Sequence, residues 1–114
     1  MPYIHIYGIN IVYDRWGEGP LRILLARKAA DWDGCDLPEG YEYLAPDLPG
    51  HGRSQGAEGL EDDELAEYVV GMAMMLHATD AEIVVHSDSR GIGEYLSDRL
   101  GLKVQVSEDC PPAD

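Results

Sequence analysis

The stretch with the clearest chemical potential joins an apolar run to a helical pattern, and it reads Val84-Val85-His86-Ser87-Asp88-Ser89-Arg90-Gly91. Such a junction predicts a sharp strand-to-helix turn. A serine on such a turn, called a nucleophile elbow, can attack a carbonyl carbon. The backbone there is strained and crowded, so small residues are needed two positions before and two positions after the nucleophile.

Three residues of this stretch could occupy the nucleophile position. With Ser87 in that position, the β-branched Val85 would fill the first small site, where it fits badly. With Asp88, both flanking residues would be bulky. With Ser89, the flanking residues are Ser87 and Gly91, which are both small. We therefore predict Ser89 as the nucleophile, and the alternative is that Ser89 is only a small residue required by a tight turn.

A serine hydroxyl is a poor nucleophile near neutral pH unless a base takes its proton. His86, at the end of the apolar run, and His51, in a loop rich in glycine and proline, are the candidate bases. The alternatives are that His86 packs at the rim of the sheet and that the base comes from a partner chain.

Four of the eight basic residues fall on loops that we expect to meet at one edge of the sheet, namely Arg27, Lys28, Arg53 and Arg90. Together with helix N-termini, they predict a crevice that attracts a small anion such as a carboxylate or phosphate. The alternative is that these cations pair with nearby carboxylates, those of Asp31, Asp33, Asp47 and Asp88.

The elements that would position these residues alternate along the chain. Two short β-rich runs around Gly8, at residues 3–7 and 10–14, predict a hairpin. Further strands are expected at residues 21–26, 41–45, 81–85 and 104–106. Helices are expected at residues 29–37, 61–77 and 91–100, the last of them capped by Gly101. This alternation predicts a mostly parallel sheet whose ligands bind at the carboxyl ends of the strands.

The run Leu44-Ala45-Pro46-Asp47-Leu48-Pro49-Gly50-His51-Gly52-Arg53-Ser54 resembles the D-x-P-G-x-G-x-S loop of the α/β-hydrolase family. The runs Gly8-Ile9-Asn10-Ile11-Val12-Tyr13 and Gly17-Glu18-Gly19-Pro20 resemble its opening strands, and Trp32 stands where the family often has a tryptophan. The resemblance covers nearly the whole chain but only the N-terminal half of a usual hydrolase. It implies an α/β fold, a minimal, lid-less three-layer sandwich with about six strands, in a single truncated domain over residues 1–114.

The resemblance implies a weak serine hydrolase of esters or thioesters, in which Ser89 attacks and the backbone amides of Lys28 and Arg90 hold the oxyanion. The chain departs from the family at three points. Ser87 replaces the first glycine of the elbow, Arg27 and its neighbours replace the usual His-Gly, and no histidine follows residue 86. The triad is therefore expected to be incomplete. The alternative is a catalytically inactive protein that binds a small anion or a protein partner.

Composition restricts the remaining possibilities. Eight basic and 22 acidic residues give the 114-residue chain a net charge of −14, which argues against binding nucleic acid or an anionic membrane. No apolar run is long enough to span a bilayer, and no signal peptide is evident, so a cytoplasmic protein is expected. We expect no cofactor and no metal site, and we expect Cys35 and Cys110 to be free thiols rather than a bridge. A homodimer that covers the last strand is also expected.

Overall fold

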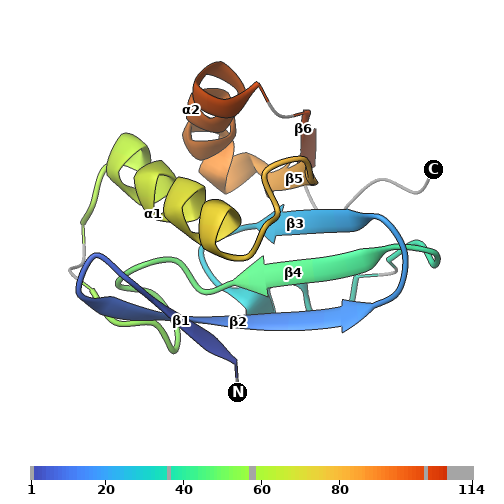
Figure 1. Ribbon diagram of the computed structural model, residues 1–114, viewed down its shortest axis with the longest axis horizontal. Helices are drawn as coiled ribbons and strands as arrows, with labels where there is room; N and C mark the ends of the chain where they lie inside the picture. Colours follow the sequence, from blue (N-terminus) through green and yellow to red (C-terminus); the bar gives the residue numbers. More distant parts are fainter. Residues whose placement is uncertain (1, 36, 57–58, 102, 108–114) are drawn as a thin grey trace.

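The protein folds around one six-stranded sheet with helices on its surface (Figure 1). The structure, a computed structural model, describes residues 2–35, 37–56, 59–101 and 103–107. The strands are β1 (Tyr3–Ile6), β2 (Ile9–Gly17), β3 (Leu21–Leu25), β4 (Glu42–Pro46), β5 (Glu82–His86) and β6 (Val104–Ser107). The helices are α1 (Asp62–Met75) and α2 (Arg90–Leu100), with short 3₁₀ helices η1 (Ala29–Trp32) and η2 (Ser87–Ser89).

The strands lie in the order β1-β2-β4-β3-β5-β6. Strand β2 runs antiparallel to both β1 and β4, whereas β4, β3, β5 and β6 are mutually parallel. The expected N-terminal hairpin is confirmed: Tyr7 and Gly8 both have positive φ, 51° and 85°, as a two-residue turn between twisted strands requires. The mostly parallel sheet expected for this fold is also confirmed.

One face of the sheet packs against both α-helices, which lie on the same side of the sheet in Figure 1. Alternate strand residues such as Ile23, Leu44 and Ile83 point to this face and are completely buried. Helix α2 approaches the sheet closely at Gly93, where an added Cβ would lie 2.9 Å from Val85 Cγ1. The apolar alternation of the strands therefore fixes where both helices pack.

The opposite face has a thinner cover, formed by η1 and the loop that follows it. Leu24, Tyr43 and Val84 pack there against the buried Trp32. The helix expected over residues 29–37 is wrong in its length, because η1 ends at Trp32. The chain continues with Asp33 in an extended conformation and with Gly34 at φ 81°, which stops helical hydrogen bonding.

The remaining helix boundaries follow the expectations closely. Helix α1 ends before His77, whose φ is 56°, and α2 is closed by Gly101 at φ 67°, whose N–H donates to Ser97 O. None of the helices in the described part of the chain is long and apolar enough to cross a membrane. Cys35 is disulfide-bonded, so the expectation of free thiols is wrong for this residue. Cys110 lies outside the described residues.

Candidate functional site at the carboxyl edge of the sheet

The loops after β3, β4 and β5 meet at one edge, as the sequence predicted. The parallel register places Leu25 of β3 beside Val85 of β5, so both strands end at the same level. Two contacts then join the loops directly. Arg27 Nη2 donates to Asp88 O at 3.0 Å, and the rings of Trp32 and His86 meet edge to face with centroids 6.0 Å apart.

Asp47, the first residue of the loop after β4, anchors this edge. The residue is 2% exposed. Its carboxylate accepts the Ala29 N–H at 2.7 Å and the Arg53 N–H and Nε–H at 2.8 Å each. Burial by itself would raise the pKa of Asp47, but the hydrogen bonds from Arg53 and Ala29 outweigh burial and lower this pKa overall. The carboxylate thus stays charged and ties two loops together.

The other residues of the family-like loop have structural roles that can be read directly. Gly52 has φ 52°, and an added Cβ would lie 2.6 Å from Asp47 Oδ2, so only glycine fits. Ser54 Oγ donates to Asp47 O at 2.6 Å and accepts the Val12 N–H at 2.8 Å. His51 Nδ1 lies 3.0 Å from Pro49 O. The Ser54 N–H donates to His51 O at 3.1 Å, but within the described ranges no hydrogen bond joins the His51 ring to a serine hydroxyl. Its observed contacts are those of a loop-shaping residue.

Ser89 lies in the predicted strand-to-helix turn, but the structure does not present it to a substrate. The residue is completely buried, and its Oγ has no hydrogen-bond partner among the residues that the structure describes. Its φ and ψ are −118° and 23°. Apart from glycine, positive φ occurs in the described chain only at Tyr7 and His77. The strained backbone that exposes an elbow nucleophile is therefore not formed here.

Ser87 occupies the more accessible position of the turn. It follows the last residue of β5 directly and is half-buried. Sequence reasoning set it aside because of Val85, yet Val85 lies inside β5, fully buried and paired with Leu25. The buried Ser89 supplies the small residue two positions later. The signal that could have identified Ser87 is its place immediately after the strand.

The backbone amides expected to hold an oxyanion are already engaged. The Lys28 N–H donates to Asp31 Oδ2 at 3.2 Å, and the Arg90 N–H donates to Ser87 O. The Asp88 N–H, which follows Ser87, donates to His86 Nδ1 at 3.2 Å. An oxyanion hole needs donors directed at the position of the developing charge, so the expected hole at Lys28 and Arg90 is not preformed.

His86 is positioned by its neighbours rather than by a serine. Its Nδ1 accepts the Asp88 N–H and lies 3.4 Å from Asp88 Oδ2, while the ring rests against Trp32. His86 therefore caps η2, whereas Asp88 lies within η2 and is exposed. In the part of the chain that is described, no hydrogen bond joins the His86 ring to the hydroxyl of Ser87 or Ser89. The geometry therefore shows no assembled serine–histidine pair.

Two of the four predicted anion-binding cations are committed to carboxylates. Arg53 Nε lies 2.8 Å from Asp47 Oδ2, and Arg53 Nη1 lies 3.2 Å from Asp14 Oδ1. The hydrogen bonds to Asp47, and then those to Asp14, raise the pKa of Arg53. Arg27 pairs with Asp62 at 3.4 Å. The alternative interpretation agrees with the contact between Arg53 and Asp47, whereas the partner of Arg27 is Asp62, which is not one of the four acids named in that alternative.

Lys28 and Arg90 are exposed, and neither forms an ion pair within the described ranges. A hollow of about 310 Å³ beside Lys28 is lined by two cations and three carboxylates, those of Lys28, Arg53, Asp14, Asp33 and Asp47. Its charge does not favour an anion. No group of three or more metal-binding side chains is placed to hold a metal ion among the residues described.

Comparison with known proteins places this architecture. No family model matches the chain. The chain in the crystal structure of TT1977 is 37% identical in sequence to this chain. The superposition covers 96% of this chain and 87% of the TT1977 chain, with a TM-score of 0.86. The bifunctional esterase/perhydrolase of Acinetobacter calcoaceticus is 29% identical over an alignment of 119 positions, which covers 92% of this chain and 43% of that protein.

A third similar protein is Est816, described as an N-acyl homoserine lactone degrading enzyme. It is 26% identical, with 90% of this chain and 42% of that chain covered and a TM-score of 0.76. The sheet order, the Asp47 loop and these similarities together show that the chain belongs to the α/β-hydrolase family. It spans less than half the length of the curated esterase that it matches.

Proposed function

We propose that this chain is a hydrolase-fold protein that acts by binding rather than by turnover of an ester. The proposal is carried by one observation, the state of the turn after β5. The amides of Lys28, Asp88 and Arg90 all donate within the protein, and no residue of the turn has positive φ. An acyl-transfer site needs both features in advance, because donors that must first break other bonds stabilise a transition state less well.

A second candidate function is weak hydrolysis of esters or thioesters. It is favoured by the half-buried Ser87 directly after β5 and by the similarity to a bifunctional esterase/perhydrolase. In this case Ser87, rather than Ser89, would attack the carbonyl carbon. The base would be His86 after its bond to Asp88 breaks, or a group outside the described residues.

One labelling experiment separates the two functions. The folded protein is incubated with a fluorophosphonate probe, which reacts with activated serines, and the mass added at each serine is measured. Binding without turnover predicts no labelling. Hydrolysis predicts labelling that Ser87→Ala removes and Ser89→Ala, the matched control in the same turn, leaves in place. Labelling at Ser87 would overturn the binding proposal.

The homodimer stays a prediction. Strand β6 is the outermost strand of the described sheet on one side, and its Val106 is 44% exposed. A second copy could pair with this edge, although the charge of −14 on each copy opposes association. Sedimentation over a wide concentration range tests the dimer, and a monomer at every concentration would contradict it.

A further inference from the structure

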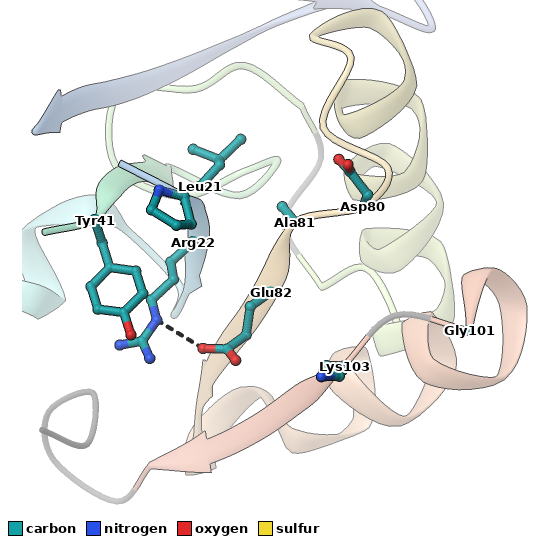
Figure 2. Close-up of a pocket in the computed structure, with 9 residues that line it drawn as sticks. Leu21, Arg22, Tyr41, Asp80, Ala81, Glu82, Gly101 and Lys103 are labelled. Atoms are coloured by element: carbon teal, nitrogen blue, oxygen red, sulfur yellow. Dashed lines mark ion pairs between the residues drawn. The ribbon is translucent and has the colours of Figure 1, made fainter. Parts of the chain in front are cut away.

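The protein holds one of its own arginines with an aromatic ring and a carboxylate. Arg22 is 2% exposed. Its guanidinium carbon lies 3.7 Å from the centroid of the Tyr41 ring, and its Nε lies 2.8 Å from Glu82 Oε1. Figure 2 shows these side chains in a hollow at the amino ends of the parallel strands. Stacking on an aromatic face together with an ion pair is the chemistry that recognises a guanidinium group.

A neighbouring hollow offers the same two kinds of group. Its volume is about 230 Å³, and its walls include Trp16, Tyr43 and Pro38, with Glu18 and Glu39 also lining it. Trp16 stacks on Tyr43 with centroids 5.6 Å apart and planes at 28°, and the Tyr43 hydroxyl donates to Pro38 O. The aromatic wall is therefore fixed in place, yet Trp16 remains 40% exposed.

The carboxylates of this hollow are available to a partner. Glu18 and Glu39 are exposed, and neither has an ion pair or side-chain hydrogen bond within the described ranges. No cation lines the hollow among those residues. Arg15, the residue before Trp16, is paired with Glu42 at 2.9 Å instead. An exposed indole beside two unpaired carboxylates suits a cation with a flat face.

We propose that the hollow beside Trp16 binds an arginine side chain, presented by a basic peptide segment of a partner protein. The guanidinium would stack on Trp16 and face Glu18 and Glu39, as Arg22 stacks on Tyr41 and pairs with Glu82. The net charge of −14 would draw such a segment toward the surface. A second hollow of about 390 Å³ shares Trp16 as a wall, which gives room for the residue next to the arginine.

This inference rests on the proposed binding role but uses a different place from the turn after β5. Fluorophosphonate labelling of Ser87 would therefore overturn the binding role, whereas the experiments on Trp16 test the arginine site alone. The two proposals can fail separately.

The test is a titration followed by NMR at the indole N–H of Trp16. The ligand is a short peptide with blocked ends and one arginine, and the comparison peptides carry citrulline or lysine at that position. The arginine peptide should shift the Trp16 signal to saturation. Citrulline, which keeps the shape without the charge, should have no effect, and lysine should bind about tenfold more weakly because it lacks the flat face.

Variants of the hollow complete the test. The double variant Glu18→Gln and Glu39→Gln should weaken arginine binding about tenfold or more. Trp16→Leu, which lacks the indole and is followed instead at the backbone amides of Gly17 and Glu18, should abolish it. Glu94→Gln, which removes an exposed carboxylate from α2, is the matched control and should bind as the wild type does. Equal binding of the citrulline peptide, or an unchanged affinity in the double variant, would overturn the proposal. Free arginine binding as tightly as the peptide would overturn the assignment to a peptide segment.

Discussion

Two neighbouring loops at the carboxyl edge of the sheet match the α/β-hydrolase pattern to very different extents. In the loop after β4, Asp47, Gly52 and Ser54 each match the family-like pattern, and each has a visible reason to be there. In the turn after β5, Ser89 is buried without a partner and Ser87 is half-buried. The first loop holds the fold together, whereas the second would carry the chemistry.

The difference teaches that a structural motif and a catalytic motif respond to different constraints. Replacing Asp47 breaks several hydrogen bonds at a buried carboxylate at once, so the fold itself requires this residue. The turn after β5 only has to connect a strand to a helix, and ordinary backbone angles at Ser89 achieve this connection. The family-like loop is therefore a reliable sign of the fold but not of an assembled catalytic site.

The largest effect should come from removing the anchor of the first loop. Asp47→Ala leaves the Ala29 N–H and the Arg53 guanidinium without their buried acceptor, so it should lower the free energy of unfolding by about 3–5 kcal/mol. Urea unfolding measures this loss. Asp33→Ala, which removes an exposed carboxylate nearby, is the control and should change stability by less than about 0.5 kcal/mol. Similar losses in both variants would show that Asp47 is not an anchor.

The next largest effect separates a steric clash from backbone strain at Gly52, which lies in the Asp47 loop. Gly52→Ala places a Cβ 2.6 Å from Asp47 Oδ2 at a φ of 52°, so it should destabilise the protein by about 2–3 kcal/mol. Gly34→Ala also has positive φ but meets nothing within 4 Å, so strain alone should cost about 1 kcal/mol. Equal losses would mean that the Asp47 side chain moves aside without cost.

The sequence was sufficient for the fold because periodicity and turn residues report local structure directly. The hairpin at Gly8, the cap at Gly101 and the strand-to-helix turn around Ser89 all follow from such signals. The length of η1 could not be predicted, because apolar residues continue past Trp32 while the backbone turns at Asp33 and Gly34.

The site was predicted less well, because accessibility depends on packing that a single sequence does not show. The rule of small flanking residues favoured Ser89, yet α2 packs so that Ser89 points inward and Ser87 remains half-buried. The hydrogen bond from the Lys28 N–H to Asp31 Oδ2 also depends on a side-chain geometry that sequence spacing alone does not reveal. The meeting of the three loops was predictable, but their hydrogen bonds were not.

A smaller effect should distinguish Ser89 from the Asp47 loop. Because Ser89 Oγ is buried without a partner among the described residues, Ser89→Ala removes an unsatisfied hydroxyl and should leave stability unchanged or raise it by up to about 1 kcal/mol. Thermal and urea unfolding measure the change, with Ser54→Ala as the contrast, since the Ser54 hydroxyl both donates and accepts. A loss at Ser89 as large as the loss at Ser54 would mean that Ser89 Oγ has a partner, such as buried water.

The smallest effect concerns pH and tests the charge of the anchor. The pKa of Asp47 is lower in the folded protein than its ordinary value, because the bonds from Arg53 and Ala29 outweigh burial. The unfolded chain therefore binds a proton at Asp47 more readily, and the stability that this carboxylate contributes is complete above the unfolded pKa, near pH 4. It declines as the pH falls through the lower folded pKa.

The pKa values of Glu42 and Glu67 are also lowered, by hydrogen bonds from Arg15 and Tyr95 respectively, so the acid loss of the wild type has several sources. Asp47→Asn removes only the part of the acid-induced stability loss that comes from protonation of Asp47, because asparagine does not titrate. The variant should be less stable than the wild type at pH 7, and the difference between the two should shrink as the pH falls below about 4. A difference that stays constant with pH would mean that Asp47 stabilises the loop by shape and hydrogen bonding, with no contribution from its charge.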